Sequence, residues 1–386
     1  MNKKFLRLFL IFNCSLFIIH YSYSQDSSRL RISLLTCTPG EELYSTFGHS
    51  AFRVIDSNSV SDVVYNYGTF NFDEGNFYLK FIRGKLQYYV SAEYFTDFKD
   101  LYQSTNRGIT EQVLNLTAEE KLNIRHFLNE NLKPENRSYK YDFFFDNCTT
   151  RLRDILKKMH DSTFCQRPVM PAGTRFRQAI HRYLDNNGQP WSKLGIDILL
   201  GMPCDAVMTP EQMQFLPDNL MTSIDSSAHP FVLSKQDIYL AQPAGSKTSP
   251  YLPLLIFSGL FILIFLLSLV KNERMKSILQ GFDGMLFFLS GLLGVILILM
   301  WTCTDHAMCR NNLNLLWALP TNLVMAFYAT SKKGWVKKYF VFTSILFSLL
   351  LLTWFFLPQH LNEALIPVVL LLLYRSIMKA SGHSWK

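Results

Sequence analysis

The chain has 386 residues, of which 49% are hydrophobic and 18% charged, and its formal net charge is +8 at pH 7. Residues 25–250 carry 24 basic and 26 acidic side chains, whereas residues 251–386 carry 11 and 4. Because nucleic-acid binding needs a concentrated basic surface on a folded domain, this distribution gives no support for a nucleic-acid partner. The sequence also lacks zinc-ligand, phosphate-loop and G-x-S-x-G patterns, so we expect no metal, no cofactor and no serine-hydrolase chemistry.

Residues 1–24 have the pattern of a secretory signal peptide. Lys3, Lys4 and Arg7 precede a short apolar run at 9–19, and small residues follow at 22–24. Such a segment directs export and is excluded from fold reasoning. A retained membrane anchor is the alternative interpretation.

Residues 25–241 are expected to form one exported α+β domain. Alternating or β-rich segments predict strands at 30–36, 50–55, 62–67, 86–92 and 109–116. Helical spacing predicts helices at 121–132, 149–160, 175–184 and 210–216. Thr117 and Glu120 have the spacing of a capping box before the first of these helices.

A small, polar linker at 242–250 (QPAGSKTSP) separates this domain from a predicted all-α membrane domain at 251–380. Five apolar segments predict five spans, at 251–270, 281–301, 313–330, 339–357 and 364–378. Pro320 and Asn322 interrupt the third, and the fifth is short. Basic residues gather in alternate loops and after the last span. By the positive-inside rule those loops are cytoplasmic, and residues 25–250 lie outside.

Cys148 is the candidate nucleophile. It lies between an aromatic run (YDFFF) and a predicted helix, and a helix N-terminus stabilises a thiolate. His49 leads into a predicted strand far upstream, and a distant Cys and His can meet in the fold as a thiol–imidazole pair. The alternative is that Cys148 is a structural thiol or half of a disulfide.

Further groups are needed to orient the imidazole and to stabilise an oxyanion. Asn66, on the next predicted strand, is our candidate for the first role, with Tyr65 and Tyr67 as alternatives. Asn147 or the Cys148 backbone N–H is the candidate for the second.

A second polar cluster lies between the second and third predicted spans, in WTCTDHAMCRNNLNLLWALP at 301–320. Polar groups near a bilayer are candidates for function, so Asp305, His306 and Asn314 are predicted to bind substrate at the outer membrane face. His306 is also a rival candidate for the catalytic base. A solvated loop is the alternative. Disulfides are possible outside the cytoplasm, with Cys303–Cys309 and Cys165–Cys204 as plausible pairs.

Four segments carry a resemblance to the Lnb family of membrane-bound lipoprotein N-acyltransferases of Bacteroides-type bacteria. They are LLTCTPGEELYSTFGHSAFRV at 34–54, VVYNYGTFNFDEGNFYLKF at 63–81, YDFFFDNCTTRLRDIL at 141–156 and TDH…NLNLLWALP at 304–320. The order His49 then Cys148 also makes the exported domain distantly similar to permuted papain-like thiol enzymes of the NlpC/P60 and lecithin:retinol acyltransferase types.

The resemblance implies a multi-pass protein of the bacterial inner membrane with its N-terminal domain in the periplasm. It further implies that an acyl chain passes from a phospholipid to Cys148 and then to the α-amino group of a diacylated apolipoprotein, with His49 as the base. Two other functions stay open. One is a periplasmic cysteine peptidase, amidase or phospholipase, and the other is a non-catalytic envelope scaffold.

Overall fold

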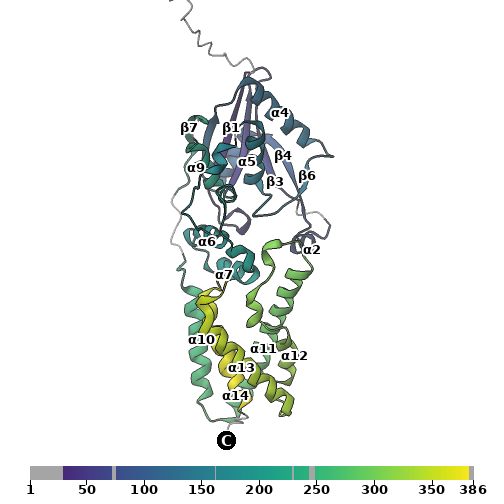
Figure 1. The fold of residues 1–386 in the computed structure, drawn as a ribbon, viewed down its shortest axis with the longest axis vertical. Coiled ribbons are helices and arrows are strands. Elements are labelled where there is room, and N and C mark those ends of the chain that lie inside the picture. The colour runs from purple at the N-terminus through teal and green to yellow at the C-terminus, as the bar shows by residue number, and fades with distance from the viewer. Residues whose placement is uncertain (1–28, 72–74, 161, 228–229, 243–247, 382–386) are drawn as a thin grey trace, which may run out of the picture.

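The computed structural model describes residues 29–71, 75–160, 162–227, 230–242 and 248–381. The predicted signal peptide and part of the predicted linker lie outside these residues. A sheet with helices on both faces stands above a bundle of helices formed by the C-terminal part of the chain (Figure 1).

The sheet has seven antiparallel strands in the order β6-β4-β3-β2-β1-β5-β7. The strands are β1 (Leu30–Cys37), β2 (His49–Asp56), β3 (Ser61–Thr69), β4 (Gln87–Tyr94), β5 (Ile109–Leu114), β6 (Ser138–Lys140) and β7 (Val232–Tyr239). The five predicted strands are confirmed. The two edge strands were not predicted, because β6 has only three residues and β7 is largely exposed.

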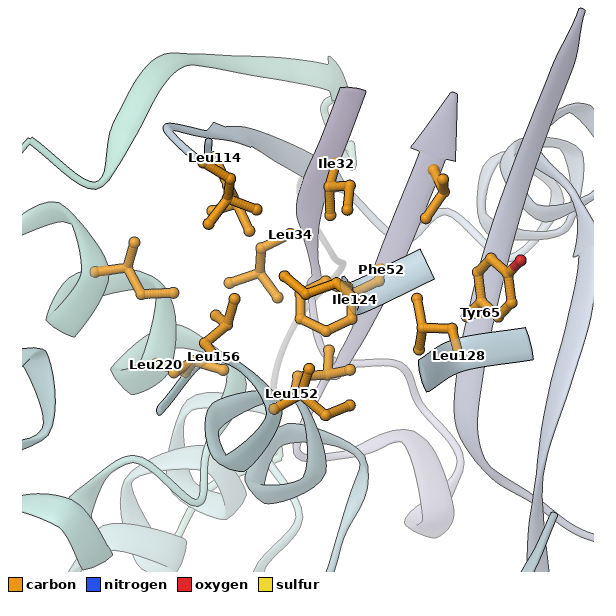
Figure 2. Packing of buried hydrophobic residues seen from close by; sticks show 14 of the residues in the cluster. Ile32, Leu34, Phe52, Tyr65, Leu114, Ile124, Leu128, Leu152, Leu156 and Leu220 are labelled. Carbon is orange, nitrogen blue, oxygen red and sulfur yellow. The ribbon is translucent and has the colours of Figure 1, made fainter. Parts of the chain in front are cut away.

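Helices cover both faces of the sheet. One face packs against α4 (Ala118–Leu132), α5 (Cys148–Met159) and α9 (Pro217–Asp225), and the other against α3 (Phe95–Ser104). Figure 2 shows Ile124 and Leu128 of α4, with Leu152 and Leu156 of α5, meeting strand residues such as Phe52. The capping box of α4 is confirmed, since the Thr117 hydroxyl accepts from the Glu120 N–H and the Glu120 carboxylate accepts from the Thr117 N–H.

A layer of helices joins the sheet to the membrane domain. It contains α6 (Phe176–Asn186), α7 (Pro190–Leu199) and α8 (Pro210–Met213). Its apolar cluster includes Met308 from the membrane domain, and Leu194 of α7 belongs to the core of the helical bundle. The two parts of the chain therefore share packed side chains.

The C-terminal domain contains α10 (Leu252–Ser268), α11 (Glu273–Thr302), α12 (Thr321–Met325), α13 (Gly334–Thr353) and α14 (Ile366–Ala380). Among the described residues, two helical segments are long and apolar enough to cross a membrane, Glu273–Thr302 and Gly334–Phe356, and Leu252–Ser268 is a shorter apolar helix. The third predicted span is not one helix. It consists of α12 between 3-10 turns at Leu313–Leu316 and Ala326–Tyr328, as expected for a segment that contains Pro320.

The six cysteines of the described residues are all free. Neither plausible disulfide is formed, and Cys165 and Cys204 belong to different apolar clusters.

Candidate functional site: a thiol–imidazole pair at the start of a helix

Cys148 is the first residue of α5, as predicted. The helix begins there because Asn147 caps it, with the Asn147 side-chain oxygen accepting from the Thr150 N–H at 2.8 Å and the Thr150 hydroxyl accepting from the Asn147 N–H at 2.8 Å. Apolar residues of α5 then pack on the sheet, which holds the helix start against the ends of β2 and β3. The thiol is half-buried, and the free N–H groups and dipole of the first turn favour its anionic form.

His49 is the first residue of β2, and its imidazole lies close enough to the Cys148 thiol for each group to shift the pKa of the other. The Nε2 atom of His49 lies 3.1 Å from Oδ1 of Asn66, on the neighbouring strand β3. Nδ1 is therefore the ring nitrogen that remains for the thiol. Asn66 in turn donates through Nδ2 to Oε1 of Glu93, on β4, at 2.6 Å. The structure thus brings Cys148, His49 and Asn66 together, and adds Glu93, which was not predicted.

Opposing effects set the pKa of the Cys148 thiol at about 7, below its usual value of 9.0. Burial raises this pKa, but the charge of His49 and its hydrogen bond lower it, as do the Ser50 backbone and the Thr149 hydroxyl. Burial also lowers the pKa of His49, but Cys148 and the hydrogen bond that His49 donates to Asn66 raise it above its usual value. The pair therefore favours a thiolate beside an imidazolium.

Three other thiols of the described residues, all of them buried, lack an imidazole partner of this kind. Burial raises the pKa of Cys37 to about 12, of Cys165 to about 11 and of Cys204 to about 12. These three thiols stay protonated at neutral pH, which suits structural residues. The contrast favours Cys148 over these three thiols as the candidate nucleophile.

The side chain of Asn147 makes hydrogen bonds within the protein that support the fold. Its Nδ2 atom donates to the backbone oxygens of Phe143, at 2.7 Å, and Phe215, at 2.9 Å, while its Oδ1 caps α5. Both amide protons are used, which argues against the predicted role as an oxyanion donor. The Cys148 backbone N–H remains the candidate from the sequence.

Tyr139 of β6 is a second potential donor that sequence reasoning missed. Its hydroxyl is buried and has no hydrogen-bond partner among the described residues. A Cβ placed on Gly68 would lie 3.9 Å from this hydroxyl oxygen and 3.8 Å from Cβ of Cys148, so the two groups flank the same point. A buried hydroxyl without a partner is costly, and a ligand oxygen at this point would satisfy it.

The predicted polar cluster divides into two parts. Asp305 and His306 contact the short helix α2 (Phe77–Ile82) and the residues after it. The Asp305 N–H donates to the backbone oxygen of Arg83, and His306 Nε2 donates to the backbone oxygen of Phe81. Asn314 is buried where the membrane domain contacts α7, and its Nδ2 donates to the Asp197 backbone oxygen. Because its side-chain amide is used in this contact, Asn314 is not a good candidate for direct substrate binding.

The site lies at the end of the sheet that faces the membrane domain. Thr46, three residues before His49, donates to the side chain of Gln189 in the turn between α6 and α7. Phe47 packs against the apolar cluster that includes Met308. Fold and site together define a membrane protein whose extramembrane domain presents a thiol–imidazole pair toward the membrane domain.

Comparison with known families agrees with this class. A model of the Lnb N-terminal periplasmic domain matches residues 20–178, and a model of the Lnb transmembrane domain matches residues 245–383. The chain belongs to the Lnb family, and it is a membrane protein with a periplasmic N-terminal domain. No curated protein and no solved structure was found to match it.

Proposed function

We propose that this protein is a lipoprotein N-acyltransferase of the bacterial inner membrane. It moves an acyl chain from a phospholipid, through a thioester on Cys148, to the α-amino group of the lipidated N-terminal cysteine of an apolipoprotein. The observation that carries the proposal is the Cys148–His49–Asn66 arrangement at the membrane-facing end of a periplasmic domain. Family membership supports a role in lipoprotein biology.

In the first step, the Cys148 thiolate attacks the ester carbonyl of the phospholipid. A C–S bond forms, the ester C–O bond breaks, and the His49 imidazolium gives its proton to the departing glycerol oxygen. The Cys148 backbone N–H and the Tyr139 hydroxyl stabilise the oxyanion in between. The products are a lysophospholipid and an acyl-Cys148 thioester.

In the second step, the α-amino group of the apolipoprotein attacks the thioester carbonyl. His49, now neutral, accepts a proton from the amine, an amide C–N bond forms, and the Cys148 thiolate departs. Asn66 keeps the imidazole oriented through both steps. A hydrolase would use the same thioester but deliver it to water, so the acceptor separates the two functions.

We also propose that the exported domain is a permuted papain-like domain at 25–241, and that the membrane domain at 251–380 crosses the bilayer five times. The nucleophile at a helix start, the histidine on a strand and the amide on the next strand support the papain-like fold.

Five crossings are supported by the segment 318–326. It runs antiparallel to α11, with Ala318 beside Gly294 and Ala326 beside Gly284. A reporter fused after Lys386 should be active only in the cytoplasm. Activity outside would contradict an odd number of crossings.

The test of function uses the full-length protein in proteoliposomes. The donor is a phospholipid with a labelled acyl chain, and the acceptor is a synthetic diacylated lipopeptide with a free α-amino group. Mass spectrometry should find the labelled chain on the lipopeptide nitrogen, and hydroxylamine should release it from the enzyme before acceptor is added. Cys148→Ser should abolish both signals, and His49→Ala should reduce transfer by more than 100-fold.

Cys303→Ser is the matched control, because Cys303 is an exposed thiol in a loop, and it should keep full transfer. Free labelled fatty acid without acylated lipopeptide would indicate a hydrolase instead. Normal lipoprotein processing by Cys148→Ser in cells would support the scaffold alternative and overturn the proposal.

A further inference from the structure

The helix α2 has an unusual surface for a soluble domain. In the segment NFYLKFIRGK, Leu79, Phe81 and Ile82 are 55%, 52% and 53% exposed, whereas Phe77 is buried. Lys80, Arg83 and Lys85 are interspersed with them. Exposed aromatic and aliphatic side chains interleaved with basic ones are typical of helices that lie in a membrane interface.

The contacts of α2 place it beside the residues that follow α11, a helix long and apolar enough to cross a membrane. The helix α2 is joined to Asp305 and His306 by the backbone and imidazole hydrogen bonds described above, and the Lys140 ammonium lies 2.7 Å from the Asp305 carboxylate. These loop residues follow the end of α11 at Thr302 by only a few positions. The 30 residues of α11 extend about 45 Å, more than the roughly 30 Å of a hydrocarbon core, so the helix is long enough to reach from one membrane surface to the other.

A row of aromatic rings connects α2 with the reactive thiol. The ring centroids are separated by 6.3 Å for Phe81–Phe77, 6.0 Å for Phe77–Phe70, 5.3 Å for Phe70–Tyr88 and 4.3 Å for Tyr88–Tyr141. Tyr141 and Cys148 then flank Gly68, whose Cβ would lie 3.8 Å from an atom of each. The row therefore runs from the exposed side chains of α2 to the neighbourhood of Cys148.

We propose that α2 inserts Leu79, Phe81 and Ile82 into the outer leaflet, and that the aromatic row receives the acyl chain of a bilayer phospholipid and guides its ester to Cys148. The occupant is a lipid because α2 contacts the loop that directly follows α11 of the membrane domain. The apolar rings match an acyl chain, and Arg83 and Lys85 match its phosphate. This inference rests on the proposed acyl transfer and adds the route by which the donor enters.

The first experiment separates lipid capture from thiol reactivity. In proteoliposomes, Leu79→Glu and Phe81→Glu should each lower transfer from bilayer phospholipid by at least 10-fold, because a carboxylate resists insertion into the leaflet. Alkylation of Cys148 by iodoacetamide should stay unchanged, since neither residue touches the thiol pair. Leu122→Glu, at an exposed leucine of α4, is the matched control and should transfer normally.

The second experiment measures insertion directly and does not depend on activity. Phe81→Trp in vesicles of phosphatidylcholine brominated on its acyl chains should show tryptophan quenching beyond that of the parent protein. Val60→Trp, in the exposed turn at the far end of β2, should show no added quenching. Equal quenching in the two variants would overturn the proposal, as would full transfer by both glutamate variants. If the parent protein transfers nothing, the proposed function fails, and the quenching still decides whether α2 enters the membrane.

Discussion

The proposed reactivity of Cys148 involves residues from three different strands. His49 begins β2, Asn66 lies on β3 and Glu93 lies on β4, and each is hydrogen-bonded to the next. Burial raises the pKa of the Glu93 carboxyl, while its hydrogen bond to Asn66 lowers it, and the net change is upward. The amide of Asn66 is thereby fixed with its oxygen toward His49, which favours the protonated imidazole.

The first prediction follows from these pKa shifts. The thiolate fraction of Cys148 rises with pH through its pKa, so the rate of alkylation by iodoacetamide should be half-maximal near pH 7 in a Cys303→Ser background. Asn66→Ala removes a hydrogen bond that raises the pKa of His49, so less imidazolium faces the thiol and the midpoint should move to higher pH. Asn58→Ala, in the exposed turn after β2, is the control. An unmoved midpoint in Asn66→Ala would remove Asn66 from the site.

The second prediction concerns the Tyr139 hydroxyl. If it donates to the oxyanion, Tyr139→Phe should lower transfer by roughly 100-fold, the usual effect of losing one such donor. The iodoacetamide midpoint of Cys148 should not change, because alkylation forms no oxyanion. Phe at this position keeps the ring that packs against Tyr67 and Arg151, so the fold is preserved. Transfer at the parent rate would leave the Cys148 backbone N–H as the proposed donor.

At the scale of elements, the interrupted third span is held against α11 by close backbone contacts. A Cβ on Gly291 would lie 2.0 Å from the Leu323 nitrogen, and one on Gly294 would lie 2.0 Å from the Ala318 oxygen. Asn322 donates to the Ser290 hydroxyl at 3.1 Å and accepts from Tyr339, so its amide is paired inside the bundle. Small residues that permit close approach and paired polar groups are typical of packed membrane segments.

Gly291→Ala should therefore destabilise the membrane domain, by about 1–3 kcal/mol for an overpacked contact. Gly281→Ala, in the same helix, is the matched control, because nothing lies within 4 Å of its Cβ position. Alanine is the better helix former, so the control should keep or raise the thermal unfolding midpoint in detergent. A Gly291→Ala midpoint as high as that of the control would contradict the close packing of α12 on α11.

At the scale of the whole molecule, a buried cluster of polar side chains around Asp197, here called the joint, fixes the two domains relative to each other. Asp197 of α7 accepts from Arg177 at 2.9 Å, His181 at 2.7 Å and Asn362 of the membrane domain at 2.8 Å. Asp205 pairs with the same arginine at 3.0 Å. The joint holds the periplasmic domain, with the Cys148 end of its sheet, against the membrane domain.

Asp197→Ala should weaken this joint strongly. It leaves Arg177 with one carboxylate and removes the contact to Asn362, and breaking a buried pair costs about 3–5 kcal/mol. The thermal unfolding midpoint should fall, and the chain should become open to proteolysis between the domains. Asp185→Ala, which removes a more exposed ion pair with Lys193, should leave both measurements unchanged. A stable, protease-resistant Asp197→Ala protein would show that apolar packing alone holds the joint.

The sequence by itself indicated five of the seven strands, several of the helices and the two residues at the centre of the candidate site, Cys148 and His49. Alternation of apolar and polar residues predicted strands, and the Thr117–Glu120 spacing predicted the start of α4. Hydropathy predicted α10, α11 and α13. These signals can be read from the sequence because each lies within a few neighbouring residues. The position of Cys148 after an aromatic run and before a helix pattern was also local. Short or exposed elements such as α2, β6 and β7 gave no comparable pattern.

Only the tertiary structure decided how side chains of similar chemistry are used. Asn147 and Asn66 are the same residue type near the same thiol. The side chain of Asn147 donates to backbone oxygens, including that of Phe215, which is distant in sequence, whereas the side chain of Asn66 accepts from His49. Asn314 supports the domain joint, whereas the nearby Asp305 and His306 hold α2. The reason is physical: a polar side chain takes its role from the donors and acceptors that surround it after folding, and those partners lie tens to hundreds of residues away in sequence.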